Sequence, residues 1–145
     1  MRERLIETAI TIIADYGLSA LTHRRLAEEA ACSLALTTYY FPKKADIVSS
    51  VSQDVLEGYL GGFDRVAQRY KQGRNVPRDL WVFSTRVIRA SAGPYRQRTM
   101  AWAEIYLDGI RRAETRALVR NWMHELQLSW KRIAAMVEPD FNQEL

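Results

Sequence analysis

Cysteine is nearly absent from this 145-residue chain, which contains only Cys32. A single cysteine excludes an intrachain disulfide and suits a reducing compartment. Long apolar runs are missing too, because the longest stretch without a charged side chain, 30–42, is too short to cross a bilayer. The N-terminus, where Arg2, Glu3 and Arg4 lead directly into a helical pattern, does not have the form of a signal peptide. We therefore expect a cytoplasmic protein without a membrane partner.

The sequence also lacks the common patterns of catalytic and cofactor sites. It has no glycine-rich phosphate loop, no nucleophile with a positioned base and no cluster of residues at metal-ligand spacing. The two histidines, His23 and His124, lie far apart in the sequence. The acid pair Glu28 and Glu29 falls on the expected solvent-facing side of a helix. We expect no enzyme activity, no catalytic residue, no metal and no cofactor.

Helical periodicity is present throughout the chain, whereas strand patterns are nearly absent. The sequence therefore predicts an all-α protein with a three-helix head, 1–43, and a helical body, 44–145. Gly58, Gly61 and Gly62 lie inside the long helix that joins them, where they mark a bend or a close approach of another segment. Apart from the pair of short helices described next, the expected helices span 2–16, 44–72, 78–92, 95–111 and 114–137, with a loop at 73–77.

Two short helices joined by a tight turn are expected between Leu21 and Pro42. Thr22 has the character of an N-cap, and Leu21 and Leu26 flank it at the spacing of a hydrophobic staple. After a turn of small residues, Ser33 caps a second helix that must end before Pro42. This layout is that of a helix-turn-helix, whose second helix enters the major groove of DNA.

The charges around the second short helix fit contact with DNA but do not prove it. The chain carries a net charge of +4, yet residues 1–45 contain six basic and five acidic side chains. Arg24 and Arg25 precede the second helix, Lys43 and Lys44 follow it, and the helix itself is uncharged. Cations on both sides of a neutral helix suit binding to phosphates. A buried helix would also be uncharged, so the charge pattern leaves both interpretations open.

The segments RERLIETAITIIADYG, LTHRRLAEEA, SLALTTYYF and PKKADIV, within residues 2–51, resemble the TetR family of bacterial transcriptional regulators. The resemblance implies a helix-turn-helix head and a ligand-binding, dimerising body. It further implies a homodimer that represses transcription from a palindromic double-stranded DNA operator and leaves it when a small effector binds. The two recognition helices would then lie about 34–36 Å apart, one turn of DNA. Only one of the two C-terminal helices that usually form the family's dimer interface is expected here, at 114–137.

The resemblance also assigns DNA contacts to particular positions. Thr22 and His23 match phosphate contacts, as does Lys44, and the recognition helix provides contacts to bases and backbone. This helix has no Arg, Lys, Asn or Gln, so it must discriminate bases through hydroxyl groups, thymine methyl contacts and DNA shape. The predicted DNA-binding set is Thr22, His23, Arg24, Ser33, Leu34, Ala35, Thr38, Tyr39, Tyr40 and Lys44.

Three positions bear further on the motif. Ala31 stands where the family's turn usually has glycine, and a left-handed backbone there would cost about 1–2 kcal/mol. Cys32 is expected to be a small core side chain. Tyr39 and Tyr40 are adjacent on a helix, so at most one of them is expected to be buried, and we expect at least one to contact phosphate.

The body is rich in large aromatic residues, which either pack a core or line an effector pocket. Tyr59 and Phe63, one turn apart beside the glycines of the long helix, are the first candidates for a pocket that would take an apolar or aromatic effector. A helical protein that binds a small molecule without binding DNA is the alternative function. The candidate pocket residues are Tyr59, Phe63, Phe83, Met100, Glu104 and Trp122.

Overall fold

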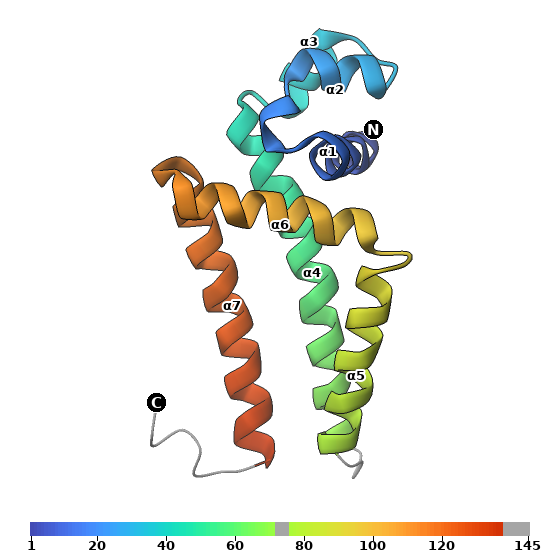
Figure 1. Ribbon diagram of the computed structural model, residues 1–145, viewed down its shortest axis with the longest axis vertical. Coiled ribbons are helices and arrows are strands. Elements are labelled where there is room, and N and C mark those ends of the chain that lie inside the picture. The colour runs from blue at the N-terminus through green and yellow to red at the C-terminus, as the bar shows by residue number, and fades with distance from the viewer. Residues whose placement is uncertain (72–75, 138–145) are drawn as a thin grey trace.

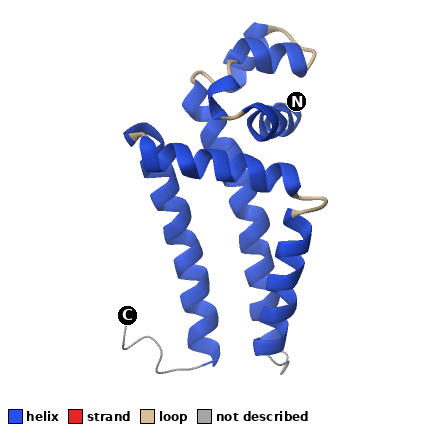
Figure 2. Cartoon of the chain, in the orientation of Figure 1, coloured by secondary structure: helices blue, strands red, loops and turns tan. Residues whose placement is uncertain are grey.

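The computed structural model describes residues 1–71 and 76–137, although some side chains within these ranges, that of Phe83 among them, lie outside the description. All of its regular structure is helical, and no strand occurs in the described ranges (Figure 2). The all-α prediction is therefore confirmed. The elements are α1 (Arg2–Tyr16), the 3-10 helix η1 (Leu18–Ala20), α2 (His23–Glu29), α3 (Leu34–Tyr40), α4 (Lys44–Lys71), α5 (Val76–Ser91), α6 (Arg96–Arg111) and α7 (Ala113–Val137).

The expected helices are present, with one correction at the start of α5. The loop predicted at 73–77 lies largely outside the described residues, but Val76 and Pro77 already belong to α5. Proline is tolerated in the first turn of a helix because the amide groups there have no partner within the helix. Pro77 therefore lies in the first turn of this helix, where the sequence suggested that it belonged to a loop.

Helix α6 lies across the molecule between the first helices and the rest of the body (Figure 1). Helix α1 lies against one side of it, and α4 and α7 extend away on the other. A continuous core joins these four helices, with Leu5 of α1, Ile47 of α4 and Ile105 of α6 all fully buried. The core thus crosses the expected boundary between residues 43 and 44, and the division into two domains stays a prediction.

Helices α6 and α7 meet at Gly109, where there is no room for a side chain. A Cβ atom at Gly109 would lie 2.5 Å from Val119 Cγ2 and 3.3 Å from the carbonyl oxygen of Thr115. The glycines of α4 have a different setting, since a Cβ at Gly58 would meet no atom within 4 Å. Close approach therefore explains Gly109 but not Gly58.

Candidate nucleic-acid interface

Helix α2 begins as the sequence predicts. The Oγ1 atom of Thr22 accepts a hydrogen bond from the backbone N–H of Arg25 at 3.1 Å. Leu21 and Leu26, on either side of this cap, are both fully buried. Capping satisfies one of the backbone donors that a helix leaves unpaired at its start, and the two leucines fix the direction in which the chain enters the helix.

The turn between α2 and α3 has the left-handed residue that the motif requires. Ala31 has a φ of 47°, so this conformation is adopted without glycine. The backbone N–H of Cys32 donates to the carbonyl of Ala27 at 3.0 Å, and that of Ala31 donates to the carbonyl of Glu28 at 3.2 Å. These two bonds form a Schellman motif, which closes the C-terminus of α2. Cys32 is half-buried and packs against the core, as expected.

Helix α3 is capped at its start and anchored at its end. The Oγ atom of Ser33 accepts a hydrogen bond from the backbone N–H of Leu36 at 3.2 Å. The helix ends at Tyr40, two residues before Pro42. The next side chain, Phe41, is 1% exposed and so ties this end of the helix to the core.

The two sides of α3 differ in exposure. Thr37 is fully buried, and its Oγ1 atom donates to the carbonyl of Leu34 at 2.8 Å. In contrast, Leu34 is 52% exposed and Tyr39 is 78% exposed. The uncharged helix is therefore not buried, and that interpretation of its composition is wrong. The exposed α3 face consists of Ser33, Leu34, Ala35, Thr38 and Tyr39.

The two tyrosines at the end of α3 have different surroundings. Tyr40 is half-buried against the core, whereas the ring of Tyr39 extends into solvent and meets Tyr40 edge-on, with 5.3 Å between centroids. At most one of them is buried, as the helical geometry predicts. The Tyr39 hydroxyl is thus the better placed of the two to reach a phosphate.

Several of the predicted phosphate contacts are engaged within the protein. The Nε2 atom of His23 lies 2.7 Å from the carbonyl oxygen of Phe41, which can only accept, so Nε2 is the donor. The ammonium group of Lys44 donates to the carbonyl of Leu18 at 2.8 Å, and burial lowers its pKa. Arg24 is paired with Glu28 on the solvent side of α2, at 3.1 Å. The His23 bond joins the start of α2 to the residue after α3, and the Lys44 bond joins the start of α4 to η1.

Lys43 is a cation that the predicted set did not include. Its backbone N–H donates to the Oδ2 atom of Asp46 at 2.8 Å, while its side chain is exposed next to the end of α3. The sequence signal was available, because Lys43 and Lys44 are adjacent and only the family's spacing favoured the second. Both lysines are exposed, but the ammonium group of Lys44 is bonded to the carbonyl of Leu18.

Part of the predicted effector pocket comes together between α4, α6 and α7. The ring of Trp122 stacks on that of Trp102, with 3.8 Å between centroids and 17° between planes, and Tyr59 meets Trp122 edge-on at 5.7 Å. We call Tyr59, Trp102 and Trp122 the aromatic cluster. The indole N–H of Trp122 is buried and has no hydrogen-bond partner in the described part of the chain. Trp102 was not among the predicted pocket residues. The signal that could have found it is its spacing of one helical turn from Tyr106, which puts two aromatic rings on one side of α6.

The other candidates lie apart from this cluster. Phe63 is buried against Trp130, with 4.8 Å between ring centroids, and Met100 is partly exposed on α6. Glu104 faces the head, because its carboxylate lies 3.4 Å from the position of a Cβ on Gly17. The side chain of Phe83 lies outside the described residues.

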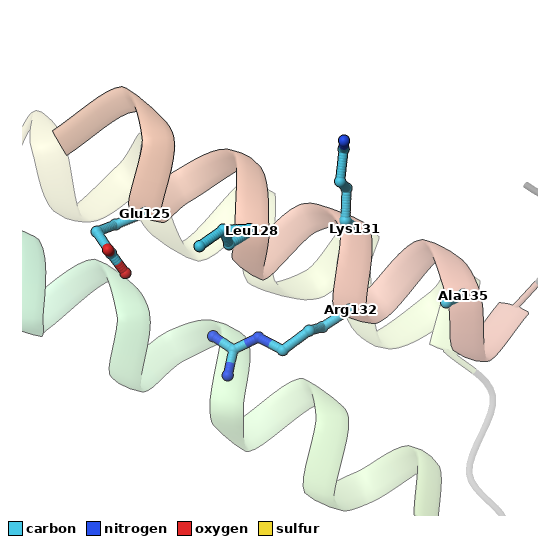
Figure 3. A pocket seen from close by; sticks show the side chains of 5 residues that line it. All are labelled: Glu125, Leu128, Lys131, Arg132 and Ala135. Atoms are coloured by element: carbon cyan, nitrogen blue, oxygen red, sulfur yellow. The ribbon is translucent and has the colours of Figure 1, made fainter. Parts of the chain in front are cut away.

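Two hollows on α7 are distinct from the aromatic cluster. One, of about 450 Å³, is lined by Glu125 and Arg132, which point toward α4, and by Lys131, which points away (Figure 3). A wider groove of about 760 Å³ runs along α6 and α7 and includes Arg116 and Arg120. The first hollow is lined largely by charged side chains, whereas the wider groove has a mainly apolar lining that includes Tyr106, Ile110 and Met123.

Comparison with known proteins identifies the segment that contains the two capped helices. Residues 5–51 match the family described as bacterial regulatory proteins, tetR family. A relative from Chromohalobacter salexigens, HTH-type transcriptional regulator BetI 1, is 35% identical over 78 residues. That match covers 54% of this chain and 37% of the relative, so the chain corresponds to little more than a third of that protein's length.

Solved structures resemble the chain over almost all of its length. A TetR-family member from Streptomyces coelicolor A3 has a TM-score of 0.69 and 26% identity, covering 91% of this chain and 74% of that one. The multidrug binding protein EbrR complexed with imidazole has a TM-score of 0.63 and 26% identity, with coverages of 93% and 71%. A regulator from Saccharomonospora viridis in complex with choline, at 21% identity and a TM-score of 0.68, shares the fold, with coverages of 99% and 71%.

Two further features of the described residues concern membrane spans and metal sites. No helix within 1–71 or 76–137 is long and apolar enough to cross a membrane. No three His, Cys, Asp or Glu side chains in these ranges are grouped so that they could hold a metal ion. The matching family and the named curated relative are regulators, not enzymes. The family match covers both capped helices, and the likeness in fold to solved structures, a TetR-family member among them, extends beyond these helices into the body.

Proposed function

We propose that this protein is a transcriptional repressor that binds a palindromic DNA operator as a homodimer and leaves it when a small effector binds in the body. TetR regulators bind DNA and small-molecule ligands, typically as dimers, which supports the DNA, ligand and dimer parts of the proposal. The observation that carries it is the exposed α3 face, in which Leu34 and Tyr39 lie in solvent. Helix α3 itself lies at the end of the molecule farthest from α5 and the far end of α7 (Figure 1).

The exposed α3 face suits a particular kind of contact with DNA. Leu34 and Ala35 offer methyl groups to thymine, and the hydroxyl groups of Ser33 and Thr38 are donors and acceptors for base edges or phosphates. Lys43 and the Tyr39 hydroxyl are available for the DNA backbone on one side of the helix. Because bidentate side chains are missing from this face, DNA shape would contribute much of the specificity.

The aromatic cluster supports an aromatic effector. Tyr59, Trp102 and Trp122 present flat rings to one another, and an effector with a planar ring could replace one of these contacts. EbrR, which has a similar fold, has been crystallised with imidazole, ethidium and proflavin. The unpaired indole N–H of Trp122 would favour an effector that also carries a hydrogen-bond acceptor, because an unmet buried donor costs about 1–3 kcal/mol.

The proposal is tested by a gel-shift titration with DNA from beside the protein's own gene, at fixed salt concentration. The substitution Tyr39→Ala removes an exposed aromatic side chain from the α3 face, and we expect it to weaken binding by about 10-fold or more. Trp81→Ala is the matched control, because Trp81 is similarly exposed but lies on α5. We expect the control to bind as the wild type does.

Two results would count against the repressor. Absence of retardation by the wild-type dimer would remove the DNA-binding part of the proposal. Binding of an aromatic dye such as proflavin by the same sample would then favour the alternative, a small-molecule-binding protein without DNA contact. The internal bonds of His23 and Lys44 are the observation that keeps this alternative in view.

A further inference from the structure

Three helices that are distant in the sequence meet at the side chain of Arg98. Arg98 belongs to α6, near the start of that helix. Its Nε atom donates to the Oδ2 atom of Asp54 on α4 at 3.1 Å, and its Nη2 atom donates to the Oε1 atom of Glu7 on α1. One guanidinium group therefore joins the first helix of the head, the long connecting helix and the helix that lies across them.

This arrangement differs from the other ion pairs in the described ranges. Arg24, Arg25 and Arg112 each pair with an acid four residues away, so those pairs add little to the relative placement of helices. Arg98 instead holds two carboxylates from different helices. The planar guanidinium fixes the directions of its donors, which the single ammonium group of lysine does not. The Arg98 side chain is only 30% exposed, so solvent screens these bonds less than those of Arg24.

The helix that carries Arg98 also carries part of the aromatic cluster. Trp102 lies one turn after Arg98 and stacks on Trp122 of α7. Between them Ala101 is fully buried in the core that α6 shares with α1. A displacement of α6 at Trp102 must therefore also move the guanidinium group of Arg98, because a helix moves nearly as a rigid body over a single turn.

We propose that Arg98 is a positioning residue that sets the placement of α1, and with it the DNA-binding head, relative to α6 and α4. The bond to Glu7 is the one that an effector at the aromatic cluster weakens, because the Glu7 carboxylate is more exposed than that of Asp54. The part of this inference that concerns regulation rests on the proposed function. The positioning role itself does not require DNA or an effector.

The substitution Glu7→Gln tests the positioning role directly. It removes the negative charge that pairs the head with Arg98 and leaves Asp54 in place. The matched control is Glu3→Gln, which removes the same charge from the same helix, since Glu3 is exposed and does not contact Arg98. The distance between head and body is measured with two spin labels, one at Glu28→Cys on α2 and one at Arg120→Cys on α7. The labelled protein carries Cys32→Ser, so that no other cysteine reacts, and is diluted with unlabelled protein so that only distances within one chain are read.

We expect Glu7→Gln and Arg98→Gln to broaden this distance distribution equally. The variant that combines both substitutions should show no broadening beyond that of either one. Operator affinity should fall about 2-fold to 5-fold in Glu7→Gln, the range of a partly exposed ion pair. Loss of a negative charge would by itself strengthen binding to DNA, so the direction of the change separates positioning from simple electrostatics. Glu3→Gln should keep the wild-type distance distribution and bind DNA at least as tightly as the wild type.

A Glu7→Gln distance distribution identical to that of Glu3→Gln would overturn the inference. So would additive broadening in the double variant, because the two side chains would then act independently. If Glu7→Gln broadens the distribution but neither it nor the wild type retards DNA, Arg98 positions the head as proposed and the repressor function fails instead.

Discussion

Ala31 has a strained backbone conformation that the turn of the helix-turn-helix requires. A φ of 47° costs an alanine about 1–2 kcal/mol, because Cβ crowds the following carbonyl oxygen in the left-handed region. The strain persists because the Schellman bonds to Ala27 and Glu28 require this conformation. Since the Ala31 side chain is exposed, its methyl group contributes little packing in return.

We therefore expect Ala31→Gly to stabilise the protein. Relief of strain is partly offset by the greater flexibility of glycine in the unfolded chain, which leaves a gain of about 1 kcal/mol in the free energy of unfolding. Urea denaturation followed by circular dichroism measures this change. Ala45→Gly, at an exposed position in the first turn of α4, is the control and should lower the free energy of unfolding by up to about 1 kcal/mol. A destabilised Ala31→Gly variant would show that the turn is not strained.

Single residues differ in how far the sequence predicts their roles. Thr22 and Ser33 were predictable as caps because their partners lie three residues away in the chain. Lys44 was assigned to phosphate, yet its ammonium group bonds to the carbonyl of Leu18, 26 residues earlier in the chain. Arg98 did not stand out in the sequence, because its importance comes from Glu7 and Asp54, which only the folded chain brings near. Long side chains with distant partners are therefore the least predictable part of the site.

Among the elements, the crossing of α6 and α7 depends on Gly109. A methyl group there would lie 2.5 Å from Val119 Cγ2, well inside van der Waals contact, and Val119 is buried in the core. We expect Gly109→Ala to lower the free energy of unfolding by about 1–3 kcal/mol, the usual cost of overpacking. Thermal and urea unfolding monitored by circular dichroism are the measurements.

Gly58→Ala is the matched control for this prediction. It makes the same change within a helix, but the new methyl group meets no atom within 4 Å. The better helix propensity of alanine should therefore raise the free energy of unfolding by up to about 1 kcal/mol. An increase in the free energy of unfolding for both Gly109→Ala and Gly58→Ala would contradict the prediction. It would mean that α6 and α7 can move apart to make room for the methyl group at little cost in free energy.

The elements themselves were largely predictable, since apolar periodicity and capping residues are local signals. The start of α5 was not, because Pro77 suits both a loop and the first turn of a helix. The exposure of α3 was also open from composition alone: an uncharged helix fits burial and DNA contact equally well. The structure decides it: Thr37 takes the buried position and Tyr39, on the far side of the helix, is exposed.

On the scale of the whole molecule, the continuous core limits how the head can move. Leu5 of α1, Ile47 of α4 and Ile105 of α6 share one buried cluster, so the head does not hang on a flexible linker. Arg98 adds a directional bond at the edge of this cluster. In a homodimer, two such heads would have a nearly fixed separation, and an operator would have to match it.

This rigidity leads to a prediction about operator spacing. Insertion of about five base pairs between the two half-sites moves the second one by roughly 17 Å and turns it by about half a helical turn, at 3.4 Å and about 34° per base pair. A head fixed to its body cannot follow both displacements. We expect the affinity of the dimer to fall about 100-fold or more, toward that of a single half-site, in a titration at constant salt concentration.

Replacement of the same central bases without a change in length is the control, and sedimentation velocity gives the number of copies bound. With the spacing unchanged, the affinity should differ from that for the original operator only because the new central bases make the DNA easier or harder to deform. Equal affinity for the original and the lengthened operator would mean that the copies bind independently. The head would then be mobile on α6 despite the shared core, and neither the dimer nor the positioning role of Arg98 would be needed to explain binding.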